Sequence, residues 1–195
     1  WRSRSWMLFS IVFFGQLILG LTLDKIFLMT GELHFPIPAM IIAGPAYRWE
    51  LSFMPILFLS TVVLSGPAWC SQLCYFGALD NLAAGKKSNF KSLQKINLYK
   101  FPLLALTILG AITLRAFNLP NKAAIIGASV IGILGILIIL FISPRKKKMV
   151  HCIAYCPVGT LLNYLKFISP FRMEIKNDCI NCMLCTPNCK YDALK

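Results

Sequence analysis

The chain has 195 residues, of which 57% are hydrophobic and only 14% are charged, and its mean hydropathy is +0.69. A soluble domain carries about a quarter charged residues, so this composition argues against one and predicts a membrane protein with a small polar appendage. The net charge is +13, but the basic residues flank apolar segments and are not interleaved with aromatic side chains, which argues against nucleic-acid binding. Because the chain begins at Trp1 and not at Met, we expect its N-terminus to be incomplete.

Four segments are apolar and long enough to cross roughly 30 Å of hydrocarbon as helices, each residue advancing about 1.5 Å. They run from residue 6 to 23, from about 51 to 68, from about 101 to 117 and from 123 to 143. The fourth contains no charged residue, whereas the second and third are close to the lower limit of length. We therefore expect an all-α membrane protein with four transmembrane helices.

The connections between these spans differ in length. Residues 24–50 join the first two spans and contain an apolar piece, Ile37–Ala43, that is too short to cross a membrane and is predicted to be re-entrant or interfacial. Residues 118–122 are so few that the third and fourth spans should form an antiparallel hairpin.

The basic residues are distributed unevenly and predict the orientation. Of the 20, only Lys25, Arg48, Arg115 and Lys122 lie in or beside the loops after the first and third spans. The positive-inside bias therefore predicts a multi-pass protein of a prokaryotic inner membrane, with both termini and all eight cysteines on the cytoplasmic side. Thiols stay reduced there, so metal ligation is favoured over structural disulfides.

An internal repeat relates two parts of the chain. A shift of 82 residues aligns Cys70 with Cys152 and Cys74 with Cys156, and each pair begins the pattern C-x3-C-x2-G-x-L-x-N. This indicates duplication of a two-helix unit, with both copies in the same orientation because an even number of spans separates them. The chain then divides into three expected units, which are residues 1–85, residues 86–170 and a ferredoxin-like tail over residues 171–195.

The tail holds the most specific chemical pattern. Its cysteines follow the spacing C-x2-C-x2-C-x3-C, and they are Cys179, Cys182, Cys185 and Cys189. Three thiolates at this spacing can hold the corners of one iron–sulfur cube, and the fourth cysteine of such a run commonly reaches a second cluster. Zinc sites instead show two C-x2-C pairs separated by a long spacer, so iron–sulfur ligation is favoured.

The two C-x3-C pairs are weak signals singly and stronger together. In a helix, cysteines four apart lie one turn apart on one face, where both sulfurs can reach one metal or cluster. Two pairs in duplicate positions at the membrane edge would supply the four ligands of one cluster. Buried packing thiols and a redox-active dithiol are the alternative interpretations.

The segments Ser65–Leu79 and Cys152–Gly159 resemble the paired C-x3-C-P motifs of membrane-bound ferredoxin-type proteins. This family includes the NapH subunit of the periplasmic nitrate reductase system, the membrane half of the regulator NosR and the CcoG-like oxidase-assembly proteins. The resemblance covers nearly the whole chain and implies electron transfer between a quinone pool and a partner protein. Members usually carry two ferredoxin motifs in the tail and this chain has one, so either the tail is truncated or the eight cysteines combine in a mixed pattern.

Two departures from the family pattern leave every ligand in place. Tyr75 stands where the first motif usually has proline, and Lys190 follows Cys189 where ferredoxins usually have proline. The simplest partition gives the tail cysteines one cluster and gives a second cluster to the membrane-edge set, which is Cys70, Cys74, Cys152 and Cys156. In a competing crossed partition, Cys189 joins the membrane-edge cluster and one membrane cysteine completes the tail cluster.

A few other polar residues carry weaker hypotheses. Glu32, His34 and Tyr47 are candidates for a quinone pocket in the Pro-rich loop, although an ordinary polar loop is the simpler interpretation. His151, beside Cys152, is interpreted as a solvated interfacial histidine, or else as a hydrogen-bonding neighbour that tunes a cluster. Because His34 and His151 are expected on opposite sides, they cannot form a haem-binding pair.

These patterns together predict an integral-membrane iron–sulfur subunit that relays electrons between a quinol pool, or another membrane donor, and a partner redox subunit. The expected cofactors are two 4Fe-4S clusters, with quinone as a further candidate, and the expected partners are other redox subunits and membrane lipid. The basic runs at residues 86–100 and 145–148 would contact anionic headgroups, each residue contributing about 1 kcal/mol. No catalytic residue is assigned, because the chemistry belongs to the clusters. The alternatives are a CcoG-like copper reductase or assembly factor and an iron–sulfur redox sensor.

Overall fold

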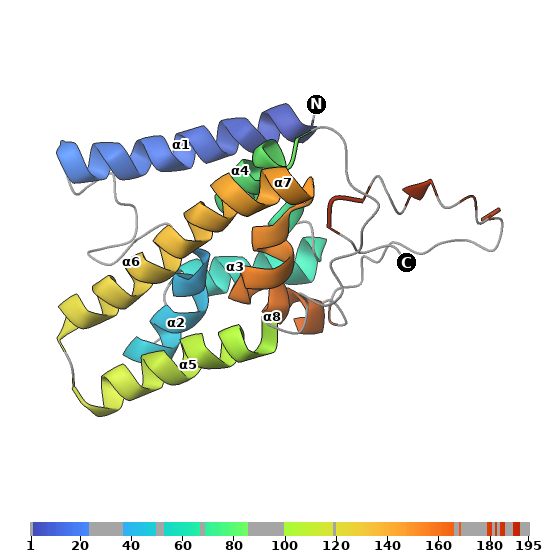
Figure 1. Cartoon of the computed structure of the whole chain (residues 1–195). Helices are drawn as coiled ribbons and strands as arrows, with labels where there is room; N and C mark the ends of the chain where they lie inside the picture. Colours follow the sequence, from blue (N-terminus) through green and yellow to red (C-terminus); the bar gives the residue numbers. More distant parts are fainter. Residues whose placement is uncertain are drawn as a thin grey trace.

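The computed structural model is a bundle of helices (Figure 1). It describes residues 2–23, 37–49, 53–66, 69–85, 100–118, 120–165, 168, 179–180, 182, 184–185 and 189–191. Every regular element among these residues is helical, which agrees with the expected all-α class. In chain order the elements are α1 (Arg2–Thr22), α2 (Pro38–Arg48), α3 (Phe53–Ser65), the π-helical turn η2 (Trp69–Leu73), α4 (Tyr75–Ala83), α5 (Lys100–Ala116), α6 (Asn121–Leu137), η4 (Ile138–Ile142), α7 (Ser143–Lys146), η5 (His151–Tyr155) and α8 (Pro157–Leu165).

Two of the described helical stretches are long and apolar enough to cross a membrane. One is Ser3–Thr22 in α1, and the other is Lys122–Lys146, which runs through α6, η4 and α7 without a break. Only 17% and 22% of these stretches are buried inside the molecule, so most of their apolar side chains face outward. The second and third expected spans form the shorter helices α3 and α5, of 13 and 17 residues.

The predicted connections between the spans include a short helix, α2, and a tight turn between α5 and α6. The short apolar piece that begins at Ile37 becomes α2, which has Pro38 in its first turn, where a missing backbone N–H costs nothing. α2 ends at Trp49, whose backbone is left-handed with a φ of 63°. The turn between α5 and α6 is as tight as expected, and Pro120 in extended conformation starts α6, so these two helices run antiparallel (Figure 1).

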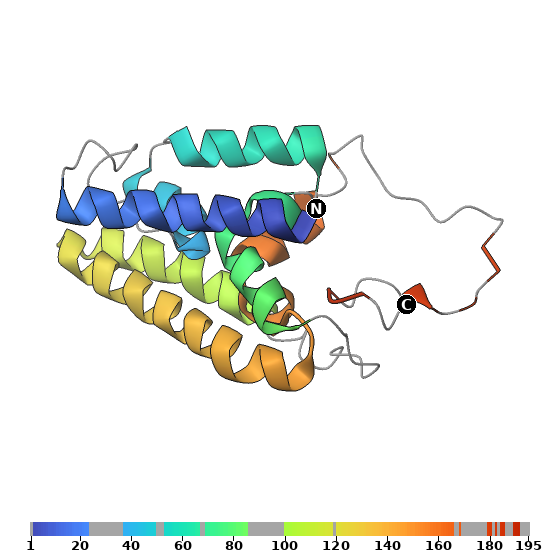
Figure 2. The same cartoon turned by 90° about the horizontal axis from the view of Figure 1, so that it is seen from above.

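The short helices gather at one end of the bundle. Figures 1 and 2 show α1, α5 and α6 running along its length, with α4, α7 and α8 together at the end where α1 begins. α1 packs against α4, and α5 packs in the same way against α8. α2 fills the space beside α5 and α8.

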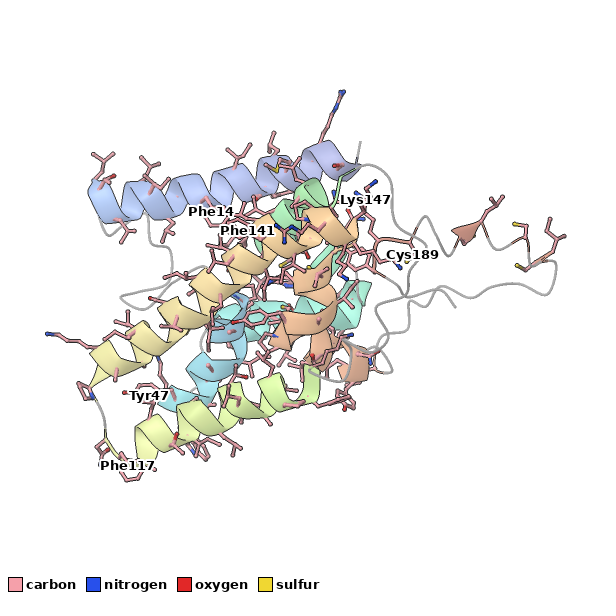
Figure 3. The ribbon with its side chains drawn as sticks, in the orientation of Figure 1. Phe14, Tyr47, Phe117, Phe141, Lys147 and Cys189 are labelled. Atoms are coloured by element: carbon pink, nitrogen blue, oxygen red, sulfur yellow. The ribbon has the colours of Figure 1, made fainter. Side chains whose placement is uncertain are left out.

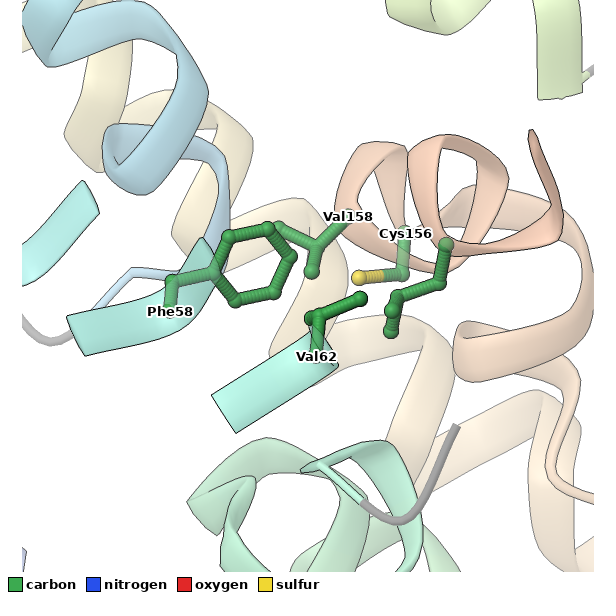
Figure 4. Close-up of a cluster of buried hydrophobic side chains, with 5 residues drawn as sticks. Phe58, Val62, Cys156 and Val158 are labelled. Atoms are coloured by element: carbon green, nitrogen blue, oxygen red, sulfur yellow. The ribbon is translucent and has the colours of Figure 1, made fainter. Parts of the chain in front are cut away.

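The hydrophobic core lies at this same end and includes cysteines. One cluster of buried side chains consists of Phe58, Val62, Cys156, Val158 and Leu162 (Figure 4). A second cluster joins Cys74 to Phe76 and Ile139. Burying one large apolar side chain contributes roughly 1.5–3 kcal/mol, so these clusters fix the position of the cysteine segments.

The basic run after the last long helix is only partly available to lipid headgroups. Arg145, Lys146 and Lys147 are exposed, as expected, but Lys148 is only 1% exposed. Only the first three basic side chains of this run are therefore available to headgroups, and lipid contact itself stays a prediction. The other run, at residues 86–100, lies outside the described residues except for Lys100.

Candidate metal centre

The two C-x3-C pairs adopt the same backbone conformation. Cys70 lies in η2 and Cys152 lies in η5, and these turns close through the N–H of Cys74 on the carbonyl of Trp69 at 3.0 Å and the N–H of Cys156 on the carbonyl of His151 at 2.9 Å. Cys74 then leaves the turn with φ −69° and ψ 115°, and Cys156 does so with φ −73° and ψ 117°. The expected α-helical turn between the two cysteines is therefore replaced by a π-helical turn with an extended residue at its end.

The extended residue directs the second cysteine of each pair toward the start of the next helix. The backbone N–H groups of Phe76 and Gly77 in α4 donate to Cys74, as those of Val158 and Gly159 in α8 donate to Cys156. These are N–H groups that a helix leaves unpaired at its N-terminus, and they favour a negatively charged sulfur. Burial outweighs them in the free thiol and raises the pKa of Cys74 to about 12.

The four thiols of the two pairs lie close enough to influence one another. Burial raises the pKa of Cys70, and the neighbouring Cys74 and Cys156 raise it further. Burial also raises the pKa of Cys152, followed by the charges of Asp80 and of the other three cysteines. Several thiolates in one desolvated place repel one another unless a cation compensates their charge, which suits a metal group. Among the described residues, no three His, Cys, Asp or Glu side chains have the spacing needed for one metal ion.

Glycine allows each cysteine turn to approach the following helix. A Cβ on Gly77 would lie 2.8 Å from the carbonyl oxygen of Cys70 and 2.7 Å from the ring of Trp6. A Cβ on Gly159 would lie 3.0 Å from the carbonyl oxygen of Cys152. The repeated glycine of the motif is thus explained by close backbone approach.

Asp80 is a buried carboxyl beside the second turn, and reasoning from the sequence missed it. It lies on α4, has no exposed surface, and accepts hydrogen bonds from the Ser143 hydroxyl and, at 3.0 Å, from the backbone N–H of Cys152. Burial raises the pKa of Asp80 to about 6, although these hydrogen bonds oppose the rise. The equivalent position in the second copy is Leu162, so the carboxyl makes the two halves unequal. Asp80 is the one charged residue of α4, and this was the signal available in the sequence.

Trp6 connects α1 to the first cysteine turn through a hydrogen bond, and reasoning from the sequence missed this residue too. Its indole Nε1 donates to the carbonyl of Cys74 at 2.8 Å, and the side chain is 1% exposed. One turn further along α1, the Ser10 hydroxyl donates to the carbonyl of Tyr75 at 3.2 Å. These partners are more than sixty residues away along the chain, so spacing in the sequence could not reveal them.

His151 corrects an expectation. It is 4% exposed, and its ring packs between Phe76 and Tyr155, so it is not a solvated interfacial histidine. Burial lowers the pKa of His151 to about 4, which keeps the ring neutral at pH 7. Neither ring nitrogen has a hydrogen-bond partner among the described residues. The backbone of Gly135 lies against this ring and partly opposes the fall in the pKa.

The tail cysteines separate into two kinds. Cys179, Cys182 and Cys185 are exposed, whereas Cys189 is half-buried. Figure 3 shows Cys189 at the end of the bundle where Lys147 also lies. The structure therefore brings Cys189 to the cysteine end of the bundle.

The expected quinone pocket is described only in part. Glu32 and His34 lie outside the described residues. Tyr47 lines an open hollow of about 790 Å³ together with Arg48, Trp49, Ile112, Arg115, Ala116 and Asn118. Figure 3 shows Tyr47 near Phe117, at the end of the bundle away from Cys189.

Two segments of the chain, residues 47–92 and 128–176, match the family model described as a 4Fe-4S binding domain. Each segment contains one cysteine turn, so the matches coincide with the two copies of the repeat. Cysteine sulfurs that accept hydrogen bonds from helix N–H groups suit such a cluster, since hydrogen bonds to sulfur stabilise thiolate ligands. These observations support a ferredoxin-type iron–sulfur protein with a redox role.

An uncharacterized protein of Methanocaldococcus jannaschii is similar to the chain, with 26% identity over 146 residues. The matched region covers 69% of this chain and 55% of that protein, so the chain spans little more than half the length of this relative. No solved structure matches the chain.

Proposed function

We propose that this protein is an integral-membrane iron–sulfur subunit that relays electrons one at a time between a membrane donor such as quinol and a partner redox subunit. The observation that carries the proposal is the pair of duplicated cysteine turns, packed together in segments that match a 4Fe-4S binding domain. A 4Fe-4S cluster supplies a one-electron couple whose potential depends on nearby hydrogen bonds, charge and solvent exposure.

The chain's own residues would serve this role in distinct ways. Cys70, Cys74, Cys152 and Cys156 would hold one cluster as thiolates, and the helix N–H groups at Cys74 and Cys156 would stabilise the charge on those sulfurs. The buried side chains around them would keep water out. The four tail cysteines would hold a second cluster.

The membrane arrangement is part of the proposal. The two long outward-facing apolar helices support it, as does the uneven distribution of basic residues along the sequence. In this arrangement α1, α3, α5 and the α6–α7 stretch cross the bilayer, and the cysteine end of the bundle faces the cytoplasm. Short helices such as α3 would be accommodated by local thinning of the bilayer.

The test is the iron and acid-labile sulfide content of the full chain, purified anaerobically in detergent. We expect about eight iron atoms per chain, corresponding to two clusters. The double variant Cys70→Ser, Cys152→Ser should retain about half of the iron, with the tail set as its internal control. Four or fewer iron atoms in the parent chain would refute the two-cluster proposal. Bound copper in place of iron would instead support a copper reductase or assembly factor.

A separate experiment tests whether quinol is the electron donor. Addition of a reduced quinone analogue to the oxidised protein should produce the electron paramagnetic resonance signal of a reduced cluster. If only a non-physiological reductant such as dithionite produces that signal, quinol is not the donor.

A further inference from the structure

The last described residues of the tail fold back onto the first cysteine turn. The carbonyl of Lys190 accepts a hydrogen bond from the backbone N–H of Met149 at 3.2 Å. The Lys190 ammonium donates to both oxygens of Asn81, at 3.2 Å to the backbone carbonyl and 2.9 Å to the side-chain Oδ1. The Tyr191 hydroxyl donates to the carbonyl of Cys70 at 3.4 Å. Lys190 and Tyr191 thus make these four hydrogen bonds to the bundle, through the backbone and side chain of Lys190 and the hydroxyl of Tyr191.

Packing follows the same contacts. Tyr191 packs against a buried cluster formed by Trp6, Ala78, Ala84 and Met149, and the half-buried Cys152 contacts this cluster too. Cys189 immediately precedes this segment and is half-buried, unlike the other three tail cysteines. The fourth cysteine of the run is thus held at the bundle while the first three are exposed.

The Lys190 and Tyr191 side chains donate hydrogen bonds to the first copy of the repeat, whereas the Lys190 backbone carbonyl accepts one from Met149 in the second copy. Asn81 closes the repeated C-x3-C-x2-G-x-L-x-N motif, and its counterpart in the second copy, Asn163, is exposed. Lys190 stands where ferredoxins usually have proline, which has no side-chain donor that could reach Asn81. A residue that departs from the ferredoxin pattern therefore makes the contact to the first copy.

We propose that Lys190 and Tyr191 form a docking segment that fixes the tail cysteines against the first cysteine turn, with Asn81 as its receptor. Lys190, Tyr191 and Asn81 are then positioning residues, which hold the two cysteine sets at a constant separation for transfer between them. What the two sets hold rests on the proposed function, but the docking itself rests only on the contacts described above.

The test is hydrogen–deuterium exchange at the Met149 amide, because this N–H is bonded to Lys190 and loses its partner when the tail undocks. In the full-length protein, Lys190→Met and Asn81→Ala should each speed exchange about tenfold, since hydrogen bonds to a charged group are among the stronger ones. The matched controls are Lys146→Met, at an exposed lysine of α7, and Asn163→Ala, which should leave this rate unchanged.

A double-variant cycle connects the two partners. If Lys190 and Asn81 act through each other, the double variant should exchange at the rate of either single variant. Should either single variant fail to fold, Tyr191→Phe keeps the aromatic packing, removes only the hydroxyl, and should still speed exchange measurably. An unchanged Met149 rate in Lys190→Met and Asn81→Ala would overturn the docking proposal.

A second readout reports on position and not on stability. In samples with unchanged iron content, undocking should weaken the magnetic interaction between the two reduced centres, seen as loss of line broadening in electron paramagnetic resonance. An unaltered interaction in variants whose Met149 amide is exposed would overturn the positioning role. Lack of iron in the parent chain would refute the proposed function alone, because the exchange comparison would still decide whether the tail docks.

Discussion

Asp80 is a buried acid in the first half of the chain whose hydrogen-bond donors come from the second half. Its carboxyl joins α4 to Ser143 at the start of α7 and to the backbone of Cys152. Buried donors that lose their acceptor cost more than the bond itself contributes. The residue therefore determines how the second cysteine turn sits against the first half.

We expect Asp80→Leu to destabilise the protein, because the Cys152 N–H and the Ser143 hydroxyl would lose their acceptor. The free energy of unfolding should fall by about 1–3 kcal/mol, measured by denaturant unfolding in detergent. Asp80→Asn keeps one acceptor oxygen and should lose less, while the lost charge should raise the reduction potential of a cluster held by the adjacent cysteines. An Asp80→Leu protein as stable as the parent chain would contradict this role.

Residues of this kind mark the limit of what the sequence could predict. The cysteines were found because their spacing is chemically specific and repeats after 82 residues. Asp80 and Trp6 belong to no such pattern, and their partners lie in distant segments. His151 was interpreted wrongly as solvated because it was expected at the inner membrane edge, whereas the folded chain encloses the ring.

At the scale of elements, the cysteine turns and their following helices form two matching units. η2 with α4 and η5 with α8 have the same lengths and the same offset of 82 residues. The repeat predicted this correspondence but not the π-helical turn, because spacing alone cannot distinguish α from π geometry. The extended conformation of Cys74 and Cys156 is what brings each sulfur to the next helix N-terminus.

We expect Gly77→Ala to disturb its unit more than Gly159→Ala disturbs the other. The new Cβ would lie at 2.7 and 2.8 Å from two neighbours at Gly77 but at 3.0 Å from one carbonyl at Gly159. The larger overlap should cost about 1–3 kcal/mol in the free energy of unfolding and reduce the bound iron.

The control is Gly127→Ala in α6, where the new Cβ meets no atom within 4 Å beyond its chain neighbours and the backbone of its own helix. This change should leave iron content intact and raise helix stability by up to about 1 kcal/mol. If Gly77→Ala and Gly159→Ala are as stable as Gly127→Ala and bind as much iron, close backbone approach does not explain the two glycines.

At the scale of the whole molecule, the main feature is the difference between the two ends of the bundle. The cysteine end contains α4, α7 and α8 with the core clusters around Cys74 and Cys156, and the opposite end contains the turn between α5 and α6 (Figure 1). The all-α class and the tight α5–α6 turn were predictable from apolar runs and loop length. The end of α3 at Ser65 was not predicted, although Gly66, which has a left-handed φ of 59°, and Pro67 form a helix-stop signal in the sequence.

The proposed orientation can be measured with reporter fusions. Alkaline phosphatase, which is active only outside the cytoplasm, should be active when fused after Asn118 and inactive when fused after Leu165. Green fluorescent protein, which folds in the cytoplasm, should show the opposite pattern at the same two positions. A reversed result at both positions would refute the positive-inside orientation.

The interlocking of the two halves has a consequence for how the protein is made. Cys74 packs against Ile139, and Cys156 packs against Phe58 and Val62, so each half encloses the second cysteine of the other. A nascent chain that ends before the second cysteine turn therefore lacks two of the four thiols. It also lacks part of the buried side chains that surround them. If the site holds the proposed cluster, we expect the cluster to be inserted only after both halves have been synthesised and have packed together.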